Sequence, residues 1–341
     1  MRQRLTQNTG FIPTLTCLVI LSSLPSLTES QSDTIVVWSQ ESHHWTRLRG
    51  IYGDPRQWVP TLQVTYVGSI PTKDRKWTVV THDPGTGFLY WVDTQDGSAI
   101  YSQFASDNLL QTTNPTRAHK VLHRQDFDIT GLAVDWNTGS VYFSETNQHF
   151  IGVTRKTDAQ LDDAFRVIAS DAVDRPIGVA VMPVWRMVYW IDAGYRTIES
   201  CELDGSNRKR FSRVQPHEVG EALCMTLDHE SQTLYWAAVF GDRVMIKKLQ
   251  LDQIDPFAED VFSLAGEINS IASYQNYIYT LNSTEFKLDI YVNDKSTKDP
   301  TREYIIDAKA NDLTIVKPQQ PTYSECNELD CSQICINVNK F

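Results

Sequence analysis

The chain has 341 residues, 41% hydrophobic and 11% aromatic, which is enough for one large all-β domain or two ordinary domains. This composition excludes an intrinsically disordered chain. The formal net charge of −11 argues against a nucleic-acid partner, and it suits a basic protein partner as well as an extracellular protein that is merely soluble.

The first 30 residues have the pattern of a secretory signal peptide. Arg2 and Arg4 precede an apolar run from Phe11 to Leu27, and small residues follow it. A membrane anchor is the alternative, but the run contains two prolines and is short for a bilayer. No later segment approaches 18 consecutive apolar residues. We therefore expect residues 1–30 to be removed and the mature chain, with no membrane span of its own, to be extracellular.

A repeated unit fills most of the remaining chain. Each copy has an apolar strand that ends near an Asp, a four-residue turn and an aromatic strand. Five aromatic strands carry a related tetrad: Tyr90-Trp91-Val92-Asp93, Tyr142-Phe143-Ser144-Glu145, Tyr189-Trp190-Ile191-Asp192, Tyr235-Trp236-Ala237-Ala238 and Tyr279-Thr280-Leu281-Asn282. The leading tyrosines lie 44 to 52 residues apart. This period, with turn signals between short strands, is typical of propeller blades of four strands each.

A degenerate copy, Val37-Trp38-Ser39-Gln40, precedes the five clear ones and raises the expected number of blades to six. Its blade lacks an inner strand before Ile35, whereas a surplus apolar strand follows the last blade. We predict that residues 312–317 supply the missing strand, so that both ends of the chain close the ring and remove its open edges. The alternative, a pair of β-sandwiches with coincidental aromatic residues, is disfavoured by five tetrads in phase.

Five cysteines remain once Cys17 leaves with the signal peptide, and this number is odd. They are Cys201, Cys224, Cys326, Cys331 and Cys335. Their use fits an oxidising compartment. Cys201 and Cys224 fall on neighbouring blades, where they either form a disulfide or remain two buried thiols.

At its tetrads the sequence resembles the YWTD repeats, also called class B repeats, of the low-density lipoprotein receptor family, which includes the Wnt co-receptors, nidogen and the epidermal growth factor precursor. The resemblance covers roughly Thr34 to Cys335. It implies an all-β, six-bladed propeller at residues 31–320, followed by an EGF-like module of which residues 321–341 hold the first half. It also implies a Cys326–Cys335 disulfide and leaves Cys331 without its usual partner in this chain.

In that family the last residue of the tetrad is a structural acceptor for backbone groups, and the aromatic residues pack between blades. The residues to which this scaffold role is assigned are Tyr90, Trp91, Asp93, Tyr142, Glu145, Tyr189, Trp190, Asp192, Tyr235, Trp236 and Tyr279. Ala238, Asn282 and Gln40 lack the charge of the acid, so their blades need other partners.

The turns between the second and third strands of each blade should gather on one face of a propeller. Acidic and exposed aromatic residues recur there, which suits a basic or amphipathic protein segment. The resemblance implies the same face. The candidate ligand-binding residues are Glu41, His43, Asp96, His149, Tyr195, Arg196, Phe240, Asp242, Glu285 and Phe286. For any single residue, an ordinary polar loop is the alternative.

Two further features fall in these turns. His43, His44 and His149 could release a ligand at acidic pH, as receptors of the family do in endosomes, or they could be solvated surface histidines. Asn282-Ser283-Thr284 is the only glycosylation sequon, and we expect Asn282 to carry a glycan.

No catalytic motif, metal-ligand spacing or phosphate-binding loop occurs, so we expect no enzyme, no cofactor and no metal. The sequence indicates an extracellular propeller of a low-density lipoprotein receptor-related protein, secreted or part of a plasma-membrane receptor, that binds protein ligands in endocytosis or in signalling of the Wnt co-receptor type. The alternatives are a nidogen-like matrix or growth-factor-precursor module and a calcium-dependent propeller hydrolase. Oligomeric state is open.

Overall fold

The computed structural model describes residues 35–42, 45–52, 65–70, 77–94, 97–104, 118–155, 164–274, 276–282, 284–292, 300, 302–305 and 310–316. For the first three strands it describes the backbone alone. The predicted signal peptide, the EGF-like tail with Cys326, Cys331 and Cys335, and the candidates His43 and Asp96 lie outside these residues.

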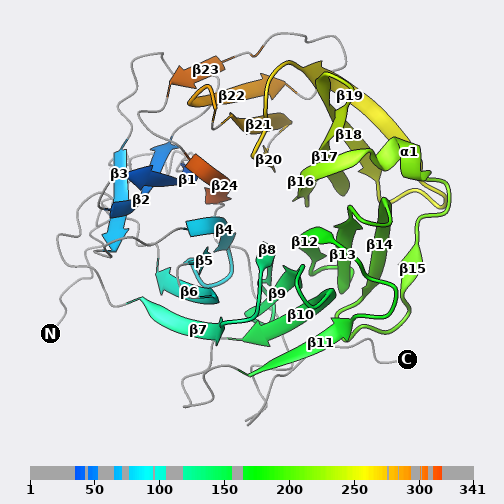
Figure 1. Cartoon of the computed structure of the whole chain (residues 1–341), viewed down its shortest axis with the longest axis horizontal. Helices are drawn as coiled ribbons and strands as arrows, with labels where there is room; N and C mark the ends of the chain where they lie inside the picture. The colour runs from blue at the N-terminus through cyan, green and yellow to red at the C-terminus, as the bar shows by residue number, and fades with distance from the viewer. Residues whose placement is uncertain are drawn as a thin grey trace, which may run out of the picture.

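The described strands form six four-stranded antiparallel sheets around a common axis (Figure 1). Five sheets each consist of four consecutive strands: β4 (Trp77–Asp83), β5 (Phe88–Asp93), β6 (Ser98–Phe104) and β7 (His119–Arg124); β8 (Ile129–Asp135), β9 (Ser140–Glu145), β10 (Phe150–Arg155) and β11 (Phe165–Ala169); β12 (Pro176–Met182), β13 (Met187–Asp192), β14 (Thr197–Glu202) and β15 (Lys209–Arg210); β16 (Glu221–Asp228), β17 (Thr233–Phe240), β18 (Arg243–Gln250) and β19 (Ala258–Leu264); and β20 (Ser270–Tyr274), β21 (Tyr277–Asn282), β22 (Lys287–Val292) and β23 (Arg302–Ile305). A short helix, α1 (Pro216–Val219), connects β15 to β16.

The remaining sheet joins strands from both ends of the described chain. Its order is β24-β1-β2-β3, with β24 at Ala310–Val316, β1 at Ile35–Ser42, β2 at Trp45–Tyr52 and β3 at Thr65–Ile70. β1 pairs antiparallel with β24 from Ile35 opposite Val316 to Gln40 opposite Ala310. This pairing confirms the predicted closing strand, which begins two residues earlier than expected.

The innermost strands of all the sheets form a ring. β4, β8, β12, β16, β20 and β24 contact one another in this order, and β24 contacts β4 in turn. They surround a central channel of about 210 Å³. The prediction of an all-β propeller is therefore confirmed. The described chain shows five blades of consecutive strands, and the predicted sixth corresponds to the sheet that combines β24 with β1–β3.

Each blade packs against the next through apolar side chains on both faces of its sheet. Along β13, Tyr189 and Ile191 pack toward the sheet β16–β19, whereas Val188 and Trp190 pack toward the sheet β8–β11. The alternation follows from the two-residue period of a strand. Because both faces are covered, the strand reads as a continuous apolar run instead of an alternating one.

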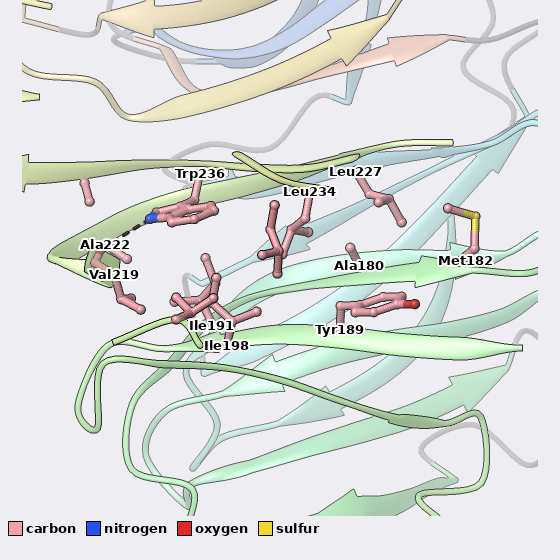
Figure 2. Packing of buried hydrophobic residues seen from close by; sticks show 13 residues of the cluster. Ala180, Met182, Tyr189, Ile191, Ile198, Val219, Ala222, Leu227, Leu234 and Trp236 are labelled. Atoms are coloured by element: carbon pink, nitrogen blue, oxygen red, sulfur yellow. Dashed lines mark hydrogen bonds between the residues drawn. The ribbon is translucent and has the colours of Figure 1, made fainter. Parts of the chain in front are cut away.

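Trp236 shows how the tetrad aromatics hold neighbouring blades together. Its indole is fully buried, and its Nε1–H donates a 3.2 Å hydrogen bond to the carbonyl of Val219 (Figure 2). The cluster around it includes Ile191 and Ile198 of the preceding blade (Figure 2). All eleven residues assigned to the scaffold are buried, none more than 4% exposed, as a packing role requires.

Cys201 and Cys224 are free thiols, so the alternative of a disulfide between them is not realised. Cys201, on β14, packs in the cluster between the sheets β8–β11 and β12–β15. Cys224, on β16, packs against the cluster between the sheets β16–β19 and β20–β23. The two side chains therefore point away from each other, each into the interface on the far side of its own blade. No small movement could bring their sulfurs to bonding distance.

Candidate ligand-binding face

One end of the propeller carries the turns that follow the tetrads, and we call it the turn face. It consists of the turns 146–149, 193–196, 241–242 and 284–286 and of the segments that lead into the inner strands, 126–128, 171–175, 214–220 and 265–269. Hydrogen bonds join the two kinds of segment, for example from Thr146 N to Asp128 O at 3.0 Å and from Ala193 N to Arg175 O at 2.8 Å.

Asp192 fixes the backbone of this face between two blade segments. Its carboxylate accepts four backbone N–H hydrogen bonds: from Asp174 at 2.7 Å, Arg175 at 3.2 Å, Gly194 at 2.9 Å and Tyr195 at 2.9 Å. A fully buried carboxylate is stable only with such partners. The acceptor role that the family resemblance implies is thus seen at this position.

Two other tetrads reproduce this arrangement to the extent that their last residue allows. Glu145 accepts the N–H of Asp128 at 2.7 Å and that of Asn147 at 2.9 Å, so the longer side chain still ties two segments together. Asn282 uses its amide oxygen for Thr284 and Glu285, at 3.0 and 2.8 Å, and holds only its own turn.

Three of these turns, and the turn that ends at Gly97, have a left-handed residue directly before the third strand of their blade. Gly97, His149, Arg196 and Phe286 have φ values of 75°, 60°, 55° and 56°. Glycine takes this conformation freely, whereas a side chain there costs roughly 1–2 kcal/mol. Three of the four positions nevertheless carry a large side chain, and all three are candidates from the sequence.

The structure places seven of the ten candidate residues with their side chains on the turn face. His149, Arg196, Asp242 and Glu285 are exposed. Glu41 lies near the end of β1, where the backbone alone is described, and His43 and Asp96 fall outside the described residues.

The aromatic candidates differ in how much of the ring a partner could reach. Tyr195 is 50% exposed and Phe286 is 42% exposed. Phe240 is half-buried: its ring lies against Gly220, and the ammonium group of Lys247 sits 5.3 Å from the ring centroid. Tyr195 and Phe286 are therefore better suited than Phe240 to contact a partner.

The predicted glycan at Asn282 is disfavoured by the structure. The side chain is only 3% exposed, and its amide oxygen is engaged in the turn. A transferred oligosaccharide needs an exposed amide nitrogen, and here that nitrogen lies close to Gly266. The sequon could not reveal this, because the same residue serves as the tetrad acceptor.

A hollow of about 460 Å³ opens on the turn face between the blades β8–β11 and β12–β15. Its lining brings His149 and Arg196 together with residues that the sequence analysis did not single out, which are Thr146, Asn147, Asp174, Arg175, Ala193 and Gly194. Asp174 and Arg175 escaped notice because they precede an inner strand instead of following a tetrad. Their position directly before the apolar strand that begins at Pro176 was the available signal.

Within the part of the chain that the structure describes, no group of three or more His, Cys, Asp or Glu side chains is arranged to hold a metal ion. Among the same residues, no helix is long and apolar enough to cross a membrane.

Comparisons with known proteins point to receptor propellers. The chain is 29% identical over 264 residues to the vitellogenin receptor of Solenopsis invicta, a match that covers 74% of this chain and 14% of the receptor. It is 27% identical over 169 residues to low-density lipoprotein receptor-related protein 5 of Mus musculus, covering 38% and 10%. Protein cueball of Drosophila sechellia is 24% identical over 217 residues, covering 62% and 31%. The chain thus spans a minor part of each relative.

Solved structures agree on the fold. A chain from the nidogen/laminin complex superposes with a TM-score of 0.66 at 17% identity, covering 84% of this chain and all of that one. A putative 6-phosphogluconolactonase from Bacteroides fragilis superposes with a TM-score of 0.56 at 10% identity, covering 85% and 99%. No model of a protein family matches the chain. The sequence relatives and the nidogen structure together support an extracellular propeller of the class B repeat type.

Proposed function

We propose that this chain is the six-bladed, ligand-binding propeller of an extracellular receptor related to the low-density lipoprotein receptor, and that protein ligands bind to its turn face. The sixth blade is the sheet that β24 completes with β1–β3. The blade count, the face and the kind of ligand are all part of the proposal.

The observation that carries the proposal is the set of large side chains at left-handed turn positions. His149, Arg196 and Phe286 occupy equivalent positions in three blades, where glycine would be less strained. The turn face thus retains strained, exposed side chains at three equivalent positions. Tyr195, next to Arg196, adds an exposed aromatic ring of the kind that often dominates protein interfaces.

The relatives supply probes for a test. One relative is a vitellogenin receptor, and a similar fold occurs in a complex of nidogen with laminin. We therefore propose to measure binding of purified vitellogenin and laminin to the immobilised chain by surface plasmon resonance. The test variant is Tyr195→Ala combined with Phe286→Ala.

A matched control lies at the opposite end of β13. Val184 is 74% exposed in the turn between β12 and β13, so Val184→Ala removes apolar surface from the other face. We expect at least one probe to bind, the double variant to weaken that binding tenfold or more, and Val184→Ala to leave it within twofold. Binding of neither probe, or equal losses in both variants, would refute the proposal.

A further inference from the structure

The hollow between the blades β8–β11 and β12–β15 presents two arginine side chains to the solvent. Arg175 is exposed and has no ion pair among the described residues. Arg196 has only a loose one: its Nη2 lies 3.6 Å from Glu221 Oε1, with both side chains about half exposed or more. An exposed pair at this distance contributes little, so both guanidinium groups remain available to an incoming anion.

The backbone beneath these arginines is fixed before any ligand arrives. Asp192 accepts the N–H groups of Arg175 and Tyr195 at 3.2 and 2.9 Å, so the two walls of the hollow share a single buried anchor. Ala193, which is 3% exposed, contributes a buried lining residue between them. Preorganised walls reduce the entropy lost on binding.

The carboxylate already in the hollow does not neutralise Arg175. Asp174 faces the opposite wall, with its Oδ1 4.0 Å from His149 Nδ1 and its carbonyl oxygen in contact with that same nitrogen. It also packs so closely against Gly194 that a Cβ there would lie 1.9 Å from Asp174 Oδ2. Asp174 therefore fills the gap between His149 and Gly194, and the guanidinium groups of Arg175 and Arg196 remain accessible to a ligand.

From this arrangement we infer that the hollow is a subsite for a carboxylate side chain, Asp or Glu, on a protein ligand bound to the turn face. Guanidinium groups match a carboxylate through paired N–H donors. Tyr195 is next to Arg196 in the sequence and half exposed, so a ligand that places a carboxylate in the hollow can also contact its ring on the turn face. The inference rests on the proposed function. It means that this part of the turn face prefers an acidic group, whereas the overall net charge of the chain favours a basic ligand.

A small probe tests the subsite without a protein ligand. N-acetyl-Ala-Asp-Ala-amide and its Asn counterpart are titrated into the full chain, and the imidazole resonances of His149 are followed by NMR. We expect a saturable shift at millimolar concentrations with the Asp peptide, none with the Asn peptide, and at least tenfold weaker binding in Arg175→Gln. Equal responses to both peptides, or tighter binding of inorganic phosphate than of the Asp peptide, overturn the inference.

A second measurement separates this inference from the proposed function. Vitellogenin binding is compared among wild type, Arg175→Gln, Arg196→Gln and the control Arg243→Gln, an exposed arginine at the start of β18 on the same face. We expect a tenfold loss in the first two and less than twofold in the control. If Tyr195→Ala with Phe286→Ala abolishes binding and the arginine variants do not, the inference of a carboxylate subsite is wrong, whereas the proposed binding role of the turn face is supported. If the Asp peptide binds and neither protein probe does, the proposed function is wrong, whereas carboxylate binding in the hollow is supported.

Discussion

The carboxylate of Asp312, on the closing strand β24, accepts a 2.7 Å hydrogen bond from the backbone N–H of Val80, on β4. The same carboxylate accepts the hydroxyl of Ser270, on β20. One side chain therefore ties together three inner strands that belong to three different sheets. Its burial raises the pKa of Asp312 from 3.8 to about 6.

This shift predicts a pH dependence of stability that Asp312→Asn removes. Because the folded state binds the proton more tightly than the unfolded state, Asp312 stabilises the fold below about pH 4, and this contribution disappears as pH rises through about 6. Relative to the variant, the wild type should gain about 1–3 kcal/mol in free energy of unfolding between pH 7 and pH 4. Urea unfolding at several pH values measures the difference. The exposed carboxylate variant Asp242→Asn is the control, and parallel profiles for all three proteins would contradict the assignment.

Truncating Trp236 should be among the most destabilising single changes. Trp236→Ala removes a fully buried indole and leaves the Val219 carbonyl without its side-chain donor, so we expect a loss of about 3–5 kcal/mol in the free energy of unfolding. Tyr195→Ala, at a half-exposed ring, should change it by less than about 1 kcal/mol. Chemical denaturation measures both. Similar losses in the two variants would mean that the blade interface does not depend on the tetrad tryptophan.

The fold was largely predictable from the sequence because the aromatic tetrads recur at a nearly constant spacing. The tetrads mark the second strands, and the surplus strand at Leu313 had no other partner, so ring closure followed. The fourth strand of the blade β12–β15 was less predictable. β15 is only two residues long, and Arg208, directly before it, pairs with Glu199 and covers the ring of Trp190, a contact between blade layers that the repeat pattern does not show.

The candidate site could be predicted only as a face, because its details arise between blades. His149 and Arg196 were identified from their turns, but their shared hollow depends also on Arg175, which belongs to the connection between their two blades. Sequence periodicity does not show such contacts. The glycan predicted at Asn282 is disfavoured for a related reason: Asn282 ends β21, and the turn that its side chain caps decides its burial.

Replacing a strained turn residue by glycine should separate stability from binding. In Arg196→Gly the left-handed φ of 55° is no longer strained, which offsets the greater flexibility of glycine in the unfolded chain. We expect the melting temperature to stay the same or rise slightly while ligand binding weakens. Differential scanning fluorimetry and surface plasmon resonance measure the two quantities. A clear drop in melting temperature would show that the side chain serves the fold and not a ligand.

Two glycines with similar backbone conformations should respond differently to alanine. Gly205 has a φ of 92°, and a Cβ there would lie 2.2 Å from the carbonyl oxygen of Ile168; Gly139 has a φ of 68° and open space around it. Gly205→Ala should therefore cost more than about 2 kcal/mol, and Gly139→Ala about 1 kcal/mol from backbone strain alone. Thermal unfolding of both variants tests this order, and the reverse order would rule out the proposed close approach.

Cys201 should be inert toward alkylating reagents in the folded protein. Burial raises the pKa of its thiol to about 12, and burial also raises the pKa of Cys224, so little thiolate exists at neutral pH. We expect iodoacetamide to modify both residues only in urea, as measured by peptide mass spectrometry. Rapid labelling of Cys201 in native buffer would contradict the packing described for β14.

The union of β1 with β24 also sets a constraint on biosynthesis. When β1 leaves the ribosome, its inner neighbour has not been translated, and five complete sheets are made before it is. During that interval one edge of β1 has no native partner, which favours aggregation or pairing with another chain. Folding of this protein should therefore depend on a chaperone that shields the earliest strand until the last one is synthesised.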